Sequence, residues 1–97
     1  MTAISFEWDE EKAEGDLKDH SIPFEEAITV FSDPNARMIH DPEHSEDEER
    51  FVVLGISSGL KLLTVCHCYR EDDMIIRIIS SRKATKREQK QYGNFLL

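Results

Sequence analysis

Three short apolar stretches joined by tight turns constrain how this chain can fold. They cover residues 51–57, 60–69 and 74–80, and Ser58-Gly59 makes the first connection. Successive strands with connections this short pair in antiparallel order. The sequence therefore predicts an antiparallel meander, which a further strand over 36–40 can extend.

Two helices are predicted ahead of the sheet. Asp9 is suited to cap the first helix, over about 10–19, whose narrow buried stripe is formed by Ala13 and Leu17. Pro23 suits the first position of the second helix, in which apolar residues recur at i, i+3, i+4 and i+7. Each helix can therefore bury one side against the sheet.

A final helix is predicted after the meander. Thr85 and Glu88 have the spacing of a capping box, in which each side chain accepts a hydrogen bond from the other residue's backbone N–H. The helix ends near Phe95, and a short apolar strand over 6–8 opens the chain. With 97 residues, the chain forms one domain, 1–97, of class α+β. We expect an antiparallel sheet with the two N-terminal helices packed on one face, a C-terminal helix, and the other face at least partly open.

Charge is distributed unevenly along the chain. The formal net charge is -8, but residues 1–50 hold 16 of the 20 acidic residues and residues 51–97 hold 8 of the 12 basic ones. Association with a partner follows local electrostatic potential more than total charge. The basic run from Arg77 to Lys90 is therefore a candidate nucleic-acid surface, with a merely solvated helix face as the alternative.

The sequence argues against several other classes of protein. Cys66 and Cys68 match neither a disulfide framework nor, with the nearby histidines, a zinc site. We therefore expect small core or half-buried residues, no metal and no cofactor. No stretch approaches the roughly 18 apolar residues of a membrane span. The N-terminus lacks the basic start and apolar core of an export signal, and we expect a cytoplasmic protein without membrane contact.

Several short motifs follow one another along the chain. They are FEWDEEKA, LKDH, FEEA, FSDP, DPEHSEDEERF, GISS and RIISSRKAT, followed by Glu88 and Tyr92. In number, order and spacing they resemble the BrnT family of toxins of type II toxin-antitoxin systems over nearly the whole chain. The resemblance implies a RelE-like fold and a metal-independent endoribonuclease that cleaves RNA and arrests growth. It also implies neutralisation by a BrnA-type antitoxin in a 2:2 heterotetramer, with operator DNA bound only through the antitoxin.

Two positions depart from the family pattern. The family commonly has His-Gly where this chain has His20-Ser21, and Ser-Ala-Arg where it has Ser80-Ser81-Arg82. Both replacements exchange one small residue for another. Glycine permits a positive φ that serine resists, so the first departure bears on the backbone of the turn after the first helix.

Arg77, Arg82 and Lys83 are candidates for stabilising the charge that develops on a phosphate during RNA cleavage. A guanidinium holds phosphate oxygens with two N–H groups and stays charged at any working pH. Arg77 interrupts an apolar strand on the same predicted face as Ile79, although an outward strand residue or a salt bridge explains it equally well. The candidate RNA-binding residues on the last helix are Lys86, Arg87 and Lys90.

Four residues are candidates for proton transfer: His67, His20, Glu88 and Tyr92. Histidine has an unperturbed pKa near neutrality, which suits a general acid or base. We hypothesise that His67 faces Arg77 from the neighbouring strand, whereas His20 could simply favour the helix dipole. The capping box accounts fully for Glu88, and Tyr92 either meets an RNA base or packs in the core.

Functions from two classes fit these features. The first is an endoribonuclease toxin that uses the basic strand-to-helix junction on the open face of the sheet. The second is a non-catalytic module that binds RNA or an acidic partner, with a degenerate toxin retained as an antitoxin partner as a further possibility. Replacing Arg77, Arg82 and Lys83 separates them, because residues that stabilise a transition state affect cleavage more than binding.

Overall fold

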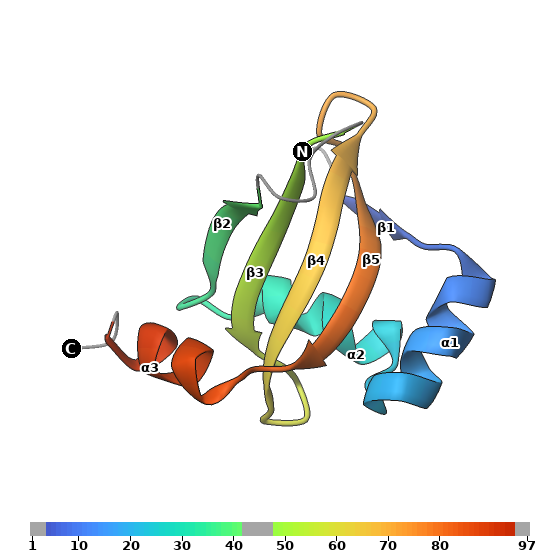
Figure 1. Ribbon diagram of the computed structural model, residues 1–97. Helices are drawn as coiled ribbons and strands as arrows, with labels where there is room; N and C mark the ends of the chain where they lie inside the picture. The colour runs from blue at the N-terminus through green and yellow to red at the C-terminus, as the bar shows by residue number, and fades with distance from the viewer. Residues whose placement is uncertain (1–3, 42–47, 95–97) are drawn as a thin grey trace.

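The chain folds into a curved sheet flanked by helices (Figure 1). The computed structural model describes residues 4–41 and 48–94. The strands are β1 (Ser5–Glu7), β2 (Arg37–Asp41), β3 (Arg50–Ile56), β4 (Leu62–Arg70) and β5 (Ile75–Lys83). They stand side by side in the order β1-β5-β4-β3-β2, and β2 to β5 pair in antiparallel order. The predicted meander and the strand before it are confirmed.

Within the described residues, four helical segments accompany the sheet. They are α1 (Glu10–His20), α2 (Phe24–Ala27), the 3-10 helix η1 (Ile28–Ser32) and α3 (Lys86–Asn94). Asp9 caps α1 by accepting a hydrogen bond from the backbone N–H of Lys12 at 3.1 Å. The second predicted helix is divided, because α2 tightens into η1 at three residues per turn. This tightening places Phe24, Ala27 and Val30 together in the core.

β1 joins the edge of the sheet by pairing in parallel with β5, which places Glu7 beside Arg77. The sequence indicated a strand here but not its partner. β1 covers only residues 75–77 of β5. Beyond them α1 lies along the free edge of β5, where the carboxylate of Asp16 accepts a hydrogen bond from the backbone N–H of Ser81 at 3.1 Å. This contact satisfies a backbone group that has no strand partner on that side.

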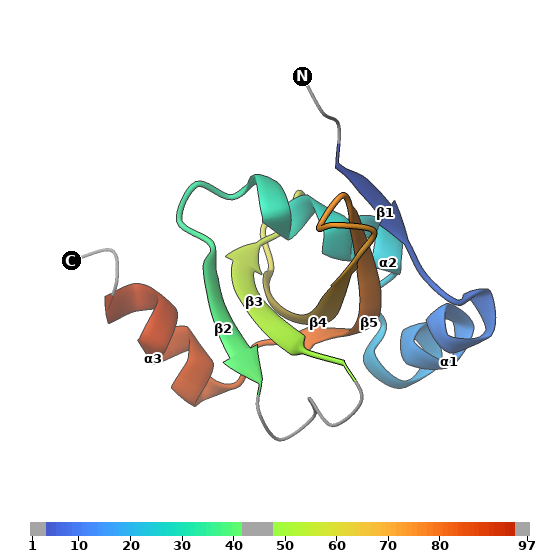
Figure 2. The ribbon, with the colours of Figure 1, turned by 90° about the horizontal axis from the view of Figure 1, so that it is seen from above.

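The core lies on the concave face of the sheet, which α2 and η1 cover (Figure 2). From this side Ile22, Phe24 and Val30 pack against apolar residues of the three central strands, namely Val53, Leu63, Val65, Ile76 and Ile78. β3 approaches η1 closely at Gly55, where a Cβ would lie 3.1 Å from the carbonyl oxygen of Val30. A larger residue there would push η1 away from the sheet.

α1 and α3 lie at opposite flanks of the convex face and leave it open between them (Figure 2). The α+β class is therefore confirmed. Ala13 of α1 packs against the core as predicted. Leu17 is 45% exposed, so the prediction that it is buried is wrong. A helix beside an edge strand buries a narrower stripe than one that lies across a sheet.

Two predicted features, the segment before β3 and the end of the last helix, fall on residues that the structure does not describe. The acidic segment between the predicted strands over 36–40 and 51–57 falls mostly on residues 42–47, which lie outside the described residues, as does Phe95, the predicted helix end. Cys66 is half-buried and Cys68 is buried, and both are free thiols. None of the helices within the described ranges has both the length and the apolar composition needed to cross a membrane.

Candidate anion-binding site on the convex face of the sheet

A β-bulge decides which side chains of β5 point the same way. The register pairs Arg77 with Cys68 and Arg82 with Thr64. Cys68 and Thr64 are an even number of residues apart on β4 and therefore share one face. β5 carries one extra residue over this stretch, Ile79, which has no partner in the register. The two arginines therefore stand on the same face, the convex one.

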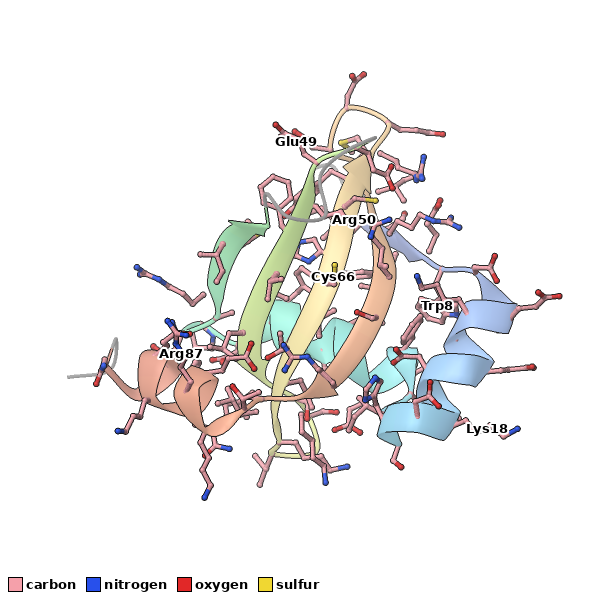
Figure 3. All side chains as sticks on the ribbon, viewed as in Figure 1. Trp8, Lys18, Glu49, Arg50, Cys66 and Arg87 are labelled. Atoms are coloured by element: carbon pink, nitrogen blue, oxygen red, sulfur yellow. The ribbon has the colours of Figure 1, made fainter. Side chains whose placement is uncertain are left out.

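A cavity of about 300 Å³ opens on this convex face. It is lined by Lys12 of α1 and by seven sheet residues, Arg50, Val52, Thr64, Cys66, Ile79, Ser80 and Arg82. Figure 3 looks onto this face, with Arg50 and Cys66 labelled in front of the strands. Three cations and two hydroxyl groups thus meet, and no carboxylate is among the described residues that line the cavity. This lining suits an anion.

Arg82 and Glu88 form a two-point ion pair at the wall of the cavity. Nη1 of Arg82 lies 2.7 Å from Oε1, and Nη2 lies 3.0 Å from Oε2. The capping box is confirmed, because Thr85 N–H donates to Glu88 at 2.9 Å and Glu88 N–H donates to the Thr85 hydroxyl at 3.2 Å. Burial alone would raise the pKa of Glu88, but hydrogen bonds from Arg82, Thr85 and Thr64 outweigh it and lower the pKa to about 2. Glu88 is therefore a poor proton acceptor at neutral pH.

Arg77 has a partner of its own. Its Nη1 pairs with Oε2 of Glu7, the residue beside it in the parallel register. Arg70 Nε lies 3.8 Å from the same carboxylate oxygen. The salt-bridge explanation thus fits Arg77, which is not among the described residues that line the cavity.

His67 lies on the concave face, away from the cavity. Its side chain is 0% exposed and contacts the rings of Phe31, Phe51 and Tyr69. In the register His67 pairs with Ile78, whereas Arg77 pairs with Cys68. Adjacent positions on a strand point to opposite faces, so the hypothesis that His67 faces Arg77 is wrong.

Tyr92 and His20 also lie away from the cavity. Tyr92 is 7% exposed and packs with Leu54 and Ala84. Burial and a hydrogen bond to Asp33 raise its pKa to about 12. His20 is exposed in the last turn of α1, as the helix-dipole explanation expects. Core packing therefore accounts for Tyr92.

The remaining predicted cations are exposed on β5 and α3. Lys83 belongs to β5 and pairs with Leu63, so the strand continues past residue 80, where the sequence predicted its end. The predicted RNA-binding cations on α3 are Lys86, Arg87 and Lys90, of which Arg87 is labelled in Figure 3. None of these four is among the described residues that line the cavity.

Sequence reasoning missed Lys12 and Arg50 as site residues. Strand alternation carried a signal for Arg50, because the residue before Phe51 must face away from the core together with Val52. Lys12 lies in the FEWDEEKA motif, but no local pattern predicts that its side chain reaches the sheet. Its place depends on α1 docking against β5 through Asp16, one helical turn further on the same side of the helix.

Known proteins offer a comparison for the whole fold. The family model described as "Ribonuclease toxin, BrnT, of type II toxin-antitoxin system" matches residues 8–88. Among solved structures, the crystal structure of the Brucella abortus ribonuclease toxin BrnT is similar, with a TM-score of 0.64 and 20% sequence identity. That match covers 89% of this chain and 100% of the Brucella chain, and it shows a shared fold. No curated protein matches the sequence.

Proposed function

The chain belongs to the BrnT family of ribonuclease toxins of type II toxin-antitoxin systems, and we propose that it is an endoribonuclease that cleaves RNA at the convex face of its sheet and thereby arrests growth. The observation that carries this proposal is the cavity in which Lys12, Arg50 and Arg82 meet. An overall acidic protein that gathers three cations around one hollow provides a local site for a polyanion.

The proposed chemistry is electrostatic. The 2′-hydroxyl loses its proton to water and attacks the neighbouring phosphorus, and negative charge accumulates on the phosphate oxygens. The bond from phosphorus to the 5′-oxygen then breaks, which leaves a 2′,3′-cyclic phosphate, and the leaving oxygen takes a proton from water. Glu88 holds Arg82 in place, and Arg50 and Lys12 line the same cavity. Together these cations can stabilise this charge, and preorganised charge is commonly the largest contribution to catalysis. No step of this proposal uses a metal ion.

Cleavage of a defined RNA oligonucleotide by the purified protein, in the presence of a chelator, tests the proposal. We expect cleavage with the chelator present, and a loss of about 100-fold or more in kcat for Arg82→Ala or Arg50→Ala. Lys12→Ala should also lower kcat. Lys18→Ala is its matched control and should not, because Lys18 is an exposed lysine of the same helix that is absent from the cavity lining. Intact RNA after incubation with the wild-type protein would overturn the proposal.

A non-catalytic RNA-binding module is the second candidate. The ion pairs Arg77–Glu7 and Arg82–Glu88 favour it, since two of the predicted catalytic arginines already have carboxylate partners. Under this alternative, Arg82→Ala weakens RNA binding and any apparent cleavage equally.

As a type II toxin, the protein has an antitoxin as its partner. We propose a BrnA-type antitoxin that covers the cationic cavity and assembles with the toxin as a 2:2 complex, which binds operator DNA only through the antitoxin. The contrast between the cationic cavity and the acidic remainder of the chain supports contact at this face. Co-expression with the neighbouring reading frame, followed by a mass measurement of the purified complex by light scattering, tests both the partner and the stoichiometry.

A further inference from the structure

Glu88 receives more hydrogen bonds than a helix cap requires. A capping box needs one bond to its carboxylate, which Thr85 N–H supplies. Three further bonds reach the same group, two from Arg82 and one from the Thr64 hydroxyl at 3.0 Å. Capping explains the first contact and leaves the other three unexplained.

The three extra bonds come from residues that line the cavity. Thr64 and Arg82 are direct partners across β4 and β5, and both contribute to the cavity wall. Glu88 bonds to both of them from the first turn of α3. Its side chain is 20% exposed, and that of Arg82 is 40% exposed. The guanidinium is therefore held in one orientation from outside the cavity, by a group that the capping box itself fixes.

This contact leaves one edge of the guanidinium available. Glu88 takes one N–H from each terminal nitrogen of Arg82, and Nη1 also lies 3.4 Å from the Lys83 carbonyl oxygen. The N–H of Nε and the second N–H of Nη2 have no partner among the described residues. In a planar guanidinium these two groups are parallel and form a fork that matches two phosphate oxygens.

We propose that Glu88 is a positioning residue for RNA cleavage, which holds one end of Arg82 so that the free edge of the guanidinium receives a phosphodiester in the cavity. This inference rests on the proposed function of the convex face. A different possibility is that the Glu88 carboxylate competes with phosphate for Arg82 and inhibits the protein. The two predict opposite changes in rate when Glu88 is replaced.

Glu88→Gln separates these possibilities. Glutamine keeps a carbonyl oxygen for Thr64 and Thr85 but loses the negative charge and one acceptor for Arg82. We expect kcat to fall about tenfold or more, because a small misplacement of a positioned group is costly. RNA affinity should stay equal or become tighter, since a negative charge beside the cavity is removed. A kcat that is unchanged or raised would overturn the proposal.

Two further variants separate positioning from stability. Thr85→Ala removes the hydroxyl half of the capping box but retains the backbone N–H and the ion pair, so it should lower the melting temperature and leave kcat unchanged. Glu88→Asp keeps the charge on a shorter side chain, and we expect kcat to stay low because the carboxylate no longer reaches both nitrogens of Arg82. A loss of kcat in Thr85→Ala as large as that in Glu88→Gln would assign the effect to the helix cap and overturn the proposal.

A double-mutant cycle completes the test. If Glu88 acts through Arg82, then Glu88→Gln has no further effect on kcat once Arg82→Ala is present. Independent, additive losses would overturn the positioning role while leaving the ribonuclease function intact. Failure of the wild-type protein to cleave RNA would instead overturn the proposed function, so the two failures are distinguishable.

Discussion

The hydroxyl of Tyr92 on α3 donates a hydrogen bond of 2.6 Å to Oδ2 of Asp33, which follows η1. The same oxygen accepts the backbone N–H of Ile56 at 2.8 Å. One carboxylate thus connects α3, the end of β3 and the turn after η1. Asp33 belongs to the FSDP motif, and its contacts assign that motif a role in folding.

Two further motifs, FEEA and GISS, also contact each other through hydrogen bonds that hold the fold. Glu26 of the FEEA motif accepts a hydrogen bond from the hydroxyl of Ser57, in the GISS motif, at 2.6 Å. Its other carboxylate oxygen lies 3.6 Å from Nζ of Lys61. These bonds fix the turn between β3 and β4 to α2. Some residues that carry the family resemblance therefore hold the scaffold, and others line the cavity, namely Lys12, Arg50, Ile79, Ser80 and Arg82.

Tyr92→Phe should destabilise the protein without abolishing cleavage. The substitution keeps the buried ring and removes a hydrogen bond to a charged group, a bond worth about 1.5–3 kcal/mol. Urea unfolding measures the loss, and an RNA-cleavage assay under conditions where the variant is folded measures kcat. A variant with wild-type stability but no cleavage would contradict the packing role and restore Tyr92 as a proton donor.

Stability should fall as the pH drops below about 6.5, because of His67. Burial lowers the pKa of His67 from its ordinary value of 6.5, against a smaller opposing effect of the Val65 carbonyl. The unfolded chain then binds a proton more readily than the folded protein does. The contribution of His67 to the free energy of unfolding is fully present above the pKa that this residue has in the unfolded chain. It is lost as the pH falls towards the pKa that His67 has in the folded protein.

Urea unfolding of the wild type and of His67→Leu between about pH 5 and pH 8 measures this dependence. The variant should have a shallower slope below about pH 6.5. Equal slopes for the wild type and His67→Leu would contradict the assignment.

Ser81→Ala should stabilise the protein. Ser81 is 0% exposed, and its hydroxyl has no hydrogen-bond partner in the part of the chain that the structure describes. An unsatisfied buried polar group costs about 1–3 kcal/mol, so the alanine that the family commonly has here removes that cost. Ser80→Ala is the control, because Ser80 is partly exposed, and its midpoint in urea should change little. A lower midpoint for Ser81→Ala would refute this prediction.

Ser21→Gly should also stabilise the protein. Ser21 ends α1 in the left-handed region, at φ 61° and ψ 20°, and its N–H donates to the Leu17 carbonyl at 2.8 Å. This conformation costs a non-glycine residue roughly 1–2 kcal/mol, part of which returns as glycine entropy in the unfolded chain. A rise of a few degrees in melting temperature is expected. Ser21→Ala retains the strain and should show no rise.

Local chemistry determined much of this fold. The alternation of apolar residues in β3, β4 and β5 depends on neighbours along the chain, and so do the caps made by Asp9 and by Thr85 with Glu88. These strands and caps were predicted correctly, because a turn or a capping box forms between residues that are close in the sequence. The ends of the strands were predicted less accurately. β5 continues through Lys83 because β4 supplies a partner for it, Leu63.

Only the tertiary structure decided which charged residues meet. Strict alternation would place Arg77 and Arg82, five positions apart, on opposite faces of β5, and the bulge at Ile79 brings them onto the same one. Lys12 reaches the cavity because α1 docks on the edge of β5, and the Arg82–Glu88 pair forms because α3 returns to the sheet. Register, edge contacts and helix docking join residues far apart in the sequence, so their free energies depend on the whole fold and leave no local pattern to read.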